Sequence, residues 1–251
     1  MPDRPSILLL TATITPPPGV SARPDPIVRL EDYRRALSFY AGKIGRGIDR
    51  IVFAENSASD VTPLQRLVDE YGYADQCEFV VFAGLDYPPT YGYGFGEFKL
   101  LDHCMRHSHT IRGAVERALI TKVTGRYIVR NLMELIRRTP GEVDVLCDIR
   151  NRKRPWADLR VMSWTRGGYD LVLSGVHTKL RDDINRIPPE MVFSRHLLDA
   201  GAGPKIATRF PIELHVHGMR GYDNRNWSGG MYSVKHYVRA CARRLLPWYP
   251  V

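Results

Sequence analysis

Short runs of consecutive apolar residues alternate along the chain with segments in which apolar residues recur every three or four positions. The continuous runs are typical of strands buried on both faces of a sheet, and they occupy residues 6–14, 48–54, 77–83, 119–123 and 143–147. The periodic segments indicate amphipathic helices and occupy residues 30–44, 62–71, 98–105 and 127–140. Because strands and helices alternate, the pattern predicts an α/β fold with a mostly parallel central sheet flanked by helices.

The last third of the chain continues the same pattern. Pro188 and Pro189 precede Glu190 at the start of a predicted helix. Residues 212–217 alternate between polar and apolar, which predicts a strand with His215 and His217 on one face. Residues 233–246 predict a basic helix that ends shortly before Trp248.

Length and composition fit one domain. With 251 residues and 44% hydrophobic content, the chain is long enough to bury a sizeable core. No apolar run reaches the roughly 18 residues of a membrane-spanning helix, and the start, MPDRPSILLL, is not that of a signal peptide. The four cysteines lie far apart without a CxxC pair, which favours reduced thiols in a cytoplasmic protein over a zinc site or a disulfide framework.

The charge is strongly basic and unevenly distributed. The chain carries 36 Lys and Arg against 27 Asp and Glu, a net charge of +9. From Gly201 onward, eight Lys or Arg face only Glu213 and Asp223. A basic surface implies an anionic partner, and charge alone leaves nucleic acid, anionic lipid and a phosphorylated small molecule open.

Polar residues follow three of the predicted strands. The first strand leads to Thr11 and Thr13, and the second ends in Glu55 and Asn56. The run at 119–123, which contains Lys122, is followed by the turn Thr124, Gly125 and Arg126. In open α/β sheets the carboxyl ends of the strands bind ligands, so these turns predict a site. The alternative is an ordinary strand-to-helix turn with a surface arginine.

A glycine-containing segment precedes the predicted helix at 98–105. Gly92, Gly94 and Gly96 lack the spacing and the preceding strand of a dinucleotide-binding fingerprint. They permit close backbone approach to a ligand, and amides at a helix start suit an anion. Glu97 follows directly. The alternative is a flexible aromatic surface loop.

Other candidates lie further along. Asp148 ends the strand at 143–147 and is either a site carboxylate or the partner of one of the arginines in the basic run that follows, Arg152, Arg154 and Arg160. Glu190 is either a catalytic carboxylate or an acid that the helix dipole favours. His215 and His217 are a metal pair or phosphate ligands, and Arg220 follows them in a glycine-rich loop.

Four segments in this order resemble the GT-A fold of nucleotide-sugar-dependent glycosyltransferases. They are the first strand, IVFAENSASD, GYGFGEFKLLDHCMRHS and TGRYIVRN. KVTGRYIVRN followed by VDVLCDIRNRKRPWADLR is similar to a group of small bacterial glycosyltransferases that build surface polysaccharides. The resemblance covers roughly residues 1–165 and implies a single GT-A-like, Rossmann-like domain over residues 1–251. Residues 1–165 would then bind the nucleotide sugar, and residues 166–251 would form the acceptor side and the basic carboxyl-terminal part.

The resemblance also implies which residues act. Gly125, Arg126 and Tyr127 stand where the family carries an aspartate-rich metal motif. Because this turn lacks the acidic pair, we expect no cofactor, and a divalent metal is the open alternative. Transfer builds negative charge on the leaving phosphate, which Arg126 can bind in place of a metal. The base candidates are Asp148, Glu97, Asp158 and Glu190. The expected donor-binding residues are Thr11, Thr13, Glu55, Asn56, Gly94, Gly96, Lys122, Thr124, Gly125, Arg150, His215, His217 and Arg220.

The sequence therefore predicts a cytoplasmic glycosyltransferase at the inner face of the membrane. Its partners would be a nucleotide-sugar donor, a glycan or lipid-linked acceptor and, peripherally, anionic lipid, with no nucleic acid expected. The first alternative is a nucleotidyltransferase, which the loop PPPGVSARPDP disfavours because it lacks the expected lysine and glycine-rich pattern. The second is a non-catalytic module that binds nucleic acid or anionic lipid through its basic carboxyl-terminal segment.

Overall fold

A seven-stranded sheet forms the centre of the protein. The computed structural model describes residues 4–151, 153–201, 203–219, 223, 238–243 and 245. Within these residues the strand order is β3-β2-β1-β4-β7-β6-β8. The strands are β1 (Ser6–Ala12), β2 (Arg50–Glu55), β3 (Cys77–Val81), β4 (Leu119–Thr124), β6 (Val145–Arg150), β7 (Trp156–Trp164) and β8 (Ile206–Ala207).

The sheet is mostly parallel, which confirms the predicted α/β architecture. β1 pairs in parallel with β2 and with β4, and β2 pairs in parallel with β3. β7 lies between β4 and β6 and is antiparallel to both. A separate two-stranded antiparallel sheet joins β5 (Ile128–Val129) to β9 (Val216–His217).

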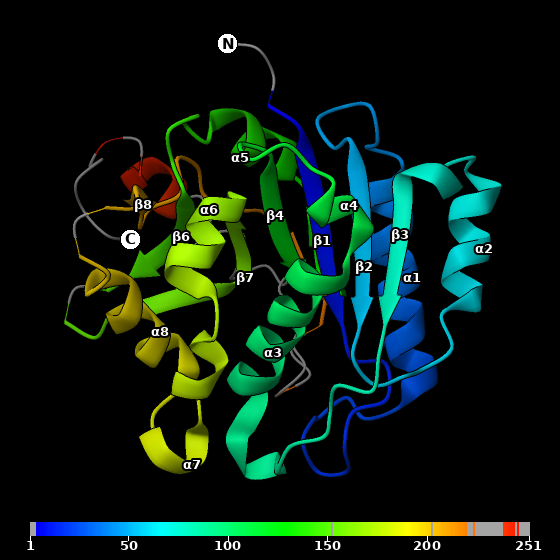
Figure 1. Ribbon diagram of the computed structural model, residues 1–251, viewed down its shortest axis with the longest axis horizontal. Coiled ribbons are helices and arrows are strands. Elements are labelled where there is room, and N and C mark those ends of the chain that lie inside the picture. The colour runs from blue at the N-terminus through cyan, green and yellow to red at the C-terminus, as the bar shows by residue number, and fades with distance from the viewer. Residues whose placement is uncertain are drawn as a thin grey trace.

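Helices cover both faces of the sheet, as Figure 1 shows. On one face lie α1 (Pro26–Ala41), α2 (Thr62–Glu70) and α5 (Leu132–Arg138). On the other lie α3 (Gly92–His107), α4 (His109–Arg112) and α8 (Pro189–Leu198). The remaining short helical segments are η1 (Ala74–Gln76), η2 (Pro89–Tyr91), α6 (Arg166–Gly168), η3 (Tyr169–Leu173), η4 (Val176–Lys179) and α7 (Asp182–Asn185).

Alternating side chains of β1 point into two core layers, one on each face of the sheet. Leu8 and Leu10 of β1 pack with α1, α2 and α5, whereas Ile7 and Leu9 pack with α3 and α8. All of these side chains are almost completely buried. A strand buried on both faces needs a near-continuous apolar run, which is why the periodicity of β1 is absent from the sequence.

Several expected elements differ from those observed. The helix predicted over 127–140 begins only at Leu132, because residues 128–129 pair with β9. The strand predicted over 212–217 is reduced to Val216–His217 and lies outside the main sheet. The sequence reading also missed β7, whose apolar run is interrupted by Asp158 and Arg160.

The carboxyl-terminal region is described in part. Residues 238–243 and 245 are helical, in agreement with the predicted basic helix, and Lys235, Arg244, Trp248 and Tyr249 lie outside the described residues. In the portion of the chain that the structure covers, no helix combines the length and the apolar character needed to cross a membrane. All four cysteines are free thiols.

Candidate active site

The three polar turns lie at one edge of the sheet. Thr11 of β1 is in register with Thr124 of β4, and Ala12 is in register with Glu55 of β2. Since these strands are parallel, their carboxyl ends face the same side, which is the lower side of the view in Figure 1. The expected convergence of the turns after β1, β2 and β4 is therefore observed.

Glu55 shapes the turn after β2 with its carboxylate. Its side chain is buried and accepts hydrogen bonds from the backbone N–H groups of Ile14 (2.9 Å), Ser57 (3.0 and 2.9 Å) and Ser59 (3.0 Å). The hydroxyl of Ser57 donates a further bond to it. These bonds occupy both oxygens, so Glu55 fixes the loops after β1 and β2 relative to each other.

The turn after β1 is held from two sides. The Thr13 hydroxyl donates to Oδ1 of Asn56 (2.6 Å), and the Arg29 guanidinium donates to the Thr13 carbonyl (2.7 Å). Tyr33 accepts a bond from the backbone N–H of Thr13 at 3.0 Å. Sequence reasoning missed Arg29 and Tyr33. Their only signal is a charged residue and a tyrosine one turn apart on the apolar face of α1, where both are buried.

A carboxylate and a lysine form the centre of the edge. Oε1 of Glu97, on α3, lies 2.5 Å from Nζ of Lys122 and accepts a 2.7 Å bond from the Thr11 hydroxyl. Nζ of Lys122 also donates to Oγ1 of Thr124 (3.0 Å) and to the carbonyl of Leu159 (2.5 Å). Lys122 is completely buried, whereas the Glu97 side chain is 24% exposed. The cluster links α3 to β1, β4 and β7.

The environment of Glu97 keeps it ionised. Burial alone raises the pKa of this carboxyl, but the charge and hydrogen bond of Lys122 outweigh burial, with smaller contributions from Thr11 and Arg126, so the pKa is lowered. Within the described residues, Oε2 of Glu97 has no hydrogen-bond partner. Glu97 therefore presents one ionised oxygen at the strand ends, which is better suited to accepting hydrogen bonds than to taking up a proton.

Gly125 brings β4 and β1 close together. Its N–H donates to the Thr11 carbonyl at 2.8 Å. A Cβ atom at this position would lie 2.8 Å from the same carbonyl oxygen and 3.3 Å from the ring of Tyr33. A side chain does not fit there without a shift of the backbone, so the turn requires glycine for packing rather than for an unusual φ angle.

Arg126 is a half-buried cation at the same edge. Its guanidinium carbon lies 4.8 Å from the centre of the Tyr127 ring. Nε donates to the Met219 carbonyl (3.3 Å), and Nη2 donates to the Tyr127 hydroxyl (3.2 Å). Burial lowers the pKa of Arg126, but Tyr127, Tyr33 and Glu97 together raise it. No carboxylate of the described residues forms an ion pair with Arg126, which leaves its positive charge available to an anion.

Gly94 and Gly96 are not part of a flexible surface loop, which was the alternative interpretation of this segment. Both lie inside α3, which begins at Gly92. A Cβ at Gly94 would lie 2.3 Å from Cβ of Pro189, and a Cβ at Gly96 would lie 2.0 Å from the hydroxyl of Tyr87. The close approach that these glycines permit is thus to protein side chains.

Asp148 is enclosed by arginines. It lies within β6, is 1% exposed, and its oxygens accept bonds from Nη1 (2.9 Å) and Nη2 (2.5 Å) of Arg243 and from Nε of Arg150 (3.0 Å). The backbone N–H of Phe210 donates at 3.0 Å. A base must reach the acceptor hydroxyl. With both oxygens occupied and almost no exposed surface, Asp148 corresponds to the alternative that made it an arginine partner.

Glu190 lies at the start of α8, and its hydrogen-bond partner is a tyrosine rather than an arginine. The Tyr93 hydroxyl donates to its carboxylate at 2.8–2.9 Å. Burial raises the pKa of Glu190, Tyr93 opposes this shift, and the neighbouring charges of Asp158 and Asp182 reinforce it. A half-buried carboxylate with a raised pKa and no cationic partner among the described residues can accept a proton near neutral pH more readily than Glu97 can.

The two histidines share a face, as predicted. Val216 is buried between them, while His215 is exposed and His217 is half-buried. Burial, followed by Arg130 and His215, lowers the pKa of His217. Over the described ranges no three His, Cys, Asp or Glu side chains come together as a metal-binding group. Arg220 lies outside the described residues.

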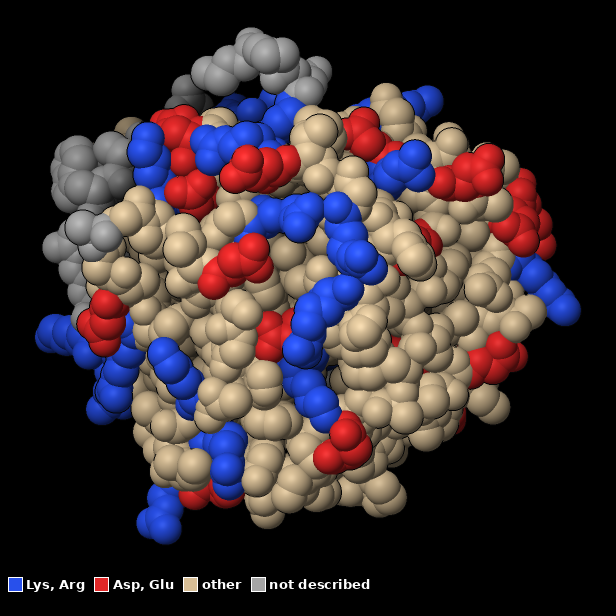
Figure 2. Space-filling model, viewed as in Figure 1, with Lys and Arg blue, Asp and Glu red and all other residues tan. Residues whose placement is uncertain are grey.

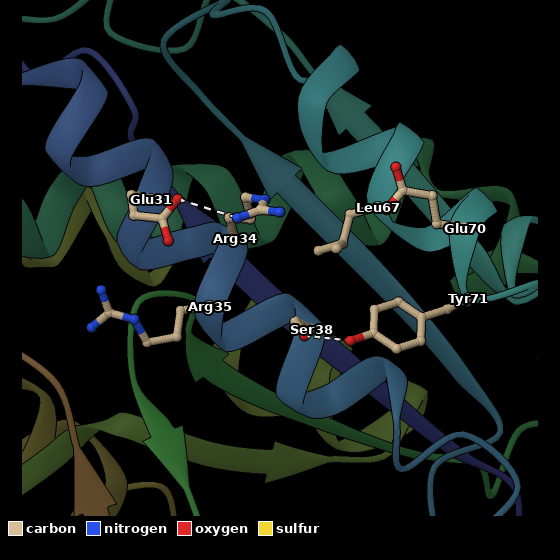
Figure 3. A pocket seen from close by; sticks show the side chains of 7 residues that line it. All are labelled: Glu31, Arg34, Arg35, Ser38, Leu67, Glu70 and Tyr71. Atoms are coloured by element: carbon tan, nitrogen blue, oxygen red, sulfur yellow. Dashed lines mark hydrogen bonds and ion pairs between the residues drawn. The ribbon is translucent and has the colours of Figure 1, made fainter.

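A surface cavity of about 500 Å³ lies away from these strand ends. It lies between α1 and α2, where Ser38 and Tyr71 share a 2.8 Å hydrogen bond and Glu31 pairs with Arg34 at 3.6 Å (Figure 3). None of the strand-end candidates lines it. Its lining residues come from α1, α2 and the residue that follows α2, whereas ligands of open α/β sheets bind at the strand ends, so the candidate active site is placed at the sheet edge.

No protein-family model and no curated protein sequence matches the chain. Among solved structures, a protein described as a nucleotide-diphospho-sugar transferase from Desulfovibrio desulfuricans G20 is 10% identical, with a TM-score of 0.47 and coverage of 95% of this chain and 97% of that chain. A glucose-1-phosphate thymidylyltransferase from Bacillus anthracis is 9% identical, with a TM-score of 0.45 and coverage of 94% of each chain.

The galactosyltransferase LgtC, solved with donor and acceptor sugar analogues, is 8% identical. Its TM-score is 0.42, and the match covers 80% of this chain and 72% of LgtC. The description of LgtC names a donor and an acceptor sugar analogue. The substrates named there are those of the solved proteins.

Proposed function

We propose that this protein is a glycosyltransferase that moves a sugar from a nucleotide-sugar donor to a glycan or lipid-linked acceptor. The observation that carries the proposal is the strand-end site. Arg126 has no acidic partner among the described residues and lies within electrostatic reach of the ionised Glu97, at the edge where β1, β2 and β4 end. Ligands of open α/β sheets bind at this edge.

In this proposal the donor lies across the turns after β1, β2 and β4. Its diphosphate is bound by Arg126, whose planar fork matches phosphate oxygens. Glu97 accepts hydrogen bonds from hydroxyl groups of the donor through its open oxygen. Residues 1–165 supply the donor part, and residues 166–251 supply the acceptor side. Lys122 and Arg150 remain proposed donor-side residues only through their charge, since carboxylates occupy both side chains. His215 and His217 remain proposed donor-side residues through their ring nitrogens.

Sugar transfer requires that the acceptor hydroxyl lose a proton and that the nucleotide leave the donor sugar through its phosphate oxygen. The bond between the anomeric carbon and the phosphate oxygen breaks, and the nucleotide leaves with the electron pair. The acceptor oxygen forms the new glycosidic bond, and its proton passes to a carboxylate. We assign that role to Glu190, because its carboxylate is half-buried at the start of α8, has the Tyr93 hydroxyl rather than a cation as its partner among the described residues, and has a pKa that burial raises. Arg126 stabilises the charge on the leaving phosphate.

A nucleotidyltransferase is the second candidate, because the solved structures with a similar fold include a thymidylyltransferase. The two reactions release different products. A glycosyltransferase consumes a nucleotide sugar, whereas a nucleotidyltransferase consumes a nucleoside triphosphate and a sugar phosphate and releases pyrophosphate. The loop after β1 disfavours the second reaction because it contains one glycine and no lysine between Thr15 and Pro26.

We further propose that the enzyme works in the cytoplasm, with peripheral contact to anionic lipid.

A thermal-shift screen with UDP-, GDP-, dTDP- and CMP-sugars tests the proposal. A ligand at 100 times its dissociation constant stabilises by about 2.7 kcal/mol, which raises the melting temperature of a chain of this size by roughly 5–10 °C. The nucleotide sugar that binds should then be turned over with an acceptor extract. Pyrophosphate release from a nucleoside triphosphate and a sugar phosphate would instead indicate the nucleotidyltransferase. Steeply salt-dependent binding of nucleic acid or lipid without turnover would indicate the non-catalytic module.

A further inference from the structure

Four arginines and three carboxylates gather beside the strand-end site. The carboxylates are Asp148, Asp158 and Glu213, each less than 9% exposed. The arginines come from three different elements: Arg150 from β6, Arg160 from β7, and Arg239 and Arg243 from the helical residues 238–243. We call these seven residues the arginine cluster.

Three of the arginines already neutralise the three carboxylates. Arg243 joins Asp148 to Glu213, with Nε 2.7 Å from Oε2 of Glu213. Arg160 forms a two-bond pair with Asp158 at 2.7 and 2.5 Å. Arg150 bridges Asp148 (3.0 Å) and Asp158 (3.1 Å). Each carboxylate thus has at least one close guanidinium partner.

Arg239 adds positive charge that these carboxylates do not balance. Its nearest carboxylate oxygen, Oε1 of Glu213, is 3.9 Å away, while Arg243 holds the other oxygen of the same carboxylate. The Arg239 side chain is 42% exposed. Arg209 also lies beside the cluster and donates to the Arg243 carbonyl at 3.4 Å.

Besides burial, the excess of positive charge lowers the pKa of Arg239. Burial lowers the pKa of Arg239, and the cations of Arg150, Arg160 and Arg243 lower it further, against the opposing effect of Glu213. The pKa of Arg209 is lowered by burial and by Arg243 in the same way. An anion that binds between these side chains would relieve this repulsion.

The arginine cluster lies beside the proposed diphosphate contact of Arg126 and shares only Arg150 with the proposed donor-side residues. Val161 of β7 pairs with Val123 of β4, so Arg160 lies one residue nearer the edge, level with Thr124. Nζ of Lys122 donates to the Leu159 carbonyl, between Asp158 and Arg160 in sequence. Arg126 does not belong to the cluster, because its charge interacts with Tyr127, Tyr33 and Glu97. The two cationic groups therefore lie along the same sheet edge as separate units.

From this juxtaposition we infer a second anion site, in which Arg239 and its neighbours in the arginine cluster bind a phosphate group carried by the acceptor. That the bound phosphate belongs to an acceptor rests on the proposed function, whereas the anion site itself rests on the excess of positive charge. A phosphate group carries about two negative charges at neutral pH and accepts bidentate guanidinium bonds. It therefore matches both the surplus charge and the donor geometry. The acceptor is then a sugar phosphate or a lipid-linked pyrophosphate.

Titration with inorganic pyrophosphate tests the site directly. The full-length Arg126→Ala protein serves as the background, because this substitution removes the proposed donor phosphate contact. Adding Arg239→Gln should weaken pyrophosphate binding at least tenfold. The matched control adds Arg138→Gln, which removes a similarly exposed arginine (53%) that pairs with Glu134 on α5. That control should change the affinity less than twofold. Equal affinities in all three proteins, or equal losses in both double variants, would overturn the inference.

Two further arms separate the possible sources of the anion. Arg239→Gln alone should leave the affinity for the nucleotide sugar found in the thermal-shift screen unchanged. A tenfold loss there would assign the cluster to the donor diphosphate and overturn the acceptor site, while leaving the proposed function intact. If no nucleotide sugar binds, the proposed function fails, and the pyrophosphate titration still decides the anion site. A soluble sugar phosphate and a short polyprenyl pyrophosphate are then compared as competitors, and competition by neither would count against the inference.

Discussion

Arginines in this protein serve two different purposes that their side-chain contacts distinguish. Arg243 is 4% exposed and donates hydrogen bonds to Asp148, to Glu213 and to the Phe210 carbonyl. Removing one partner of such a pair leaves an uncompensated buried charge. Arg126 has a tyrosine ring and a backbone carbonyl as its neighbours instead. Its charge is not neutralised within the described residues, and that is the condition a phosphate-binding group has to meet.

We predict that Arg126→Ala lowers the initial rate of sugar transfer on the order of 100-fold, because one fixed donor to the transition state is lost. Arg126→Lys should recover only part of the rate, since lysine keeps the charge but not the planar fork. Donor turnover should persist in excess EDTA, because Arg126 supplies the charge that a metal would supply. The measurement is the initial rate of each protein with and without chelator.

The opposite pattern would assign the charge-neutralising role to a metal. In that case EDTA abolishes turnover, Arg126→Ala is nearly silent, and His215 and His217 become the first ligands to test. Melting temperatures of the variants serve as the control for folding. Within the described residues the hydrogen bonds of the Arg126 side chain go to Tyr127 and the Met219 carbonyl, so both substitutions should leave the melting temperature within a few degrees of the wild type.

Strand ends could be predicted from the sequence because they depend on local signals. A continuous apolar run followed by polar residues is enough to place Thr11, Glu55 and Thr124 on one edge once the strands are taken as parallel. β7 could not be predicted in this way. Asp158 is buried and pairs with Arg160 of the same strand and with Arg150 of β6, and that compensation depends on a partner strand. β5 and β9 are two residues each and exist only through their mutual pairing.

The same limit applies to the candidate site. Glu97 was a candidate because it follows the glycine segment, but its partner Lys122 was placed separately, and nothing local in the sequence links them. Asp148 illustrates the reverse case. It lies near a strand end as a catalytic carboxylate would, yet its main partner, Arg243, is 95 residues away in the sequence. Long-range pairing therefore decides which strand-end carboxylates stay open to a ligand.

At the level of elements, the β1–β4 junction depends on Gly125. We predict that Gly125→Ala destabilises the protein by about 1–3 kcal/mol, the usual cost of forcing extra volume into packed structure. The new Cβ would lie 2.8 Å from the Thr11 carbonyl, so the strand ends must separate. Because Thr11 and Thr124 also contact Glu97 and Lys122, nucleotide-sugar affinity should fall together with stability. Chemical denaturation and a binding titration measure the two effects.

Gly141→Ala is the matched control for this substitution. Gly141 has no heavy atom within 4 Å of a built Cβ and no positive φ angle, so an alanine fits there. Its stability and nucleotide-sugar affinity should equal those of the wild type or slightly exceed them. If Gly125→Ala left stability and nucleotide-sugar affinity as unchanged as this control, the turn would have space for a Cβ atom, contrary to the contact distances. The strand ends would then not depend on close packing.

On the scale of the whole molecule, basic side chains are not confined to the carboxyl-terminal region. Figure 2 shows a line of Lys and Arg that crosses the front of the protein over α3 and α4. α3 and α4 contribute Lys99, Arg106 and Arg112, of which the two arginines are exposed. Of the terminal basic residues that were expected to contact lipid, Arg243 is instead buried in ion pairs. The proposed contact with anionic lipid therefore has to rely on other cations.

The carboxyl-terminal residues act first as part of the fold. We predict that a chain ending at Ser233 is destabilised by about 3–5 kcal/mol, because Asp148 and Glu213 lose the guanidinium that pairs with both. For a chain of this size the melting temperature should fall by roughly 10 °C. A chain ending at Leu245 keeps Arg243 and should melt within a few degrees of the wild type. Full-length Arg243→Ala isolates the ion pairs and should reproduce most of the loss. If the chain ending at Ser233 and the Arg243→Ala protein both melted with the wild type, the terminal residues would be an appendage, and the arginine cluster would not hold them to the sheet.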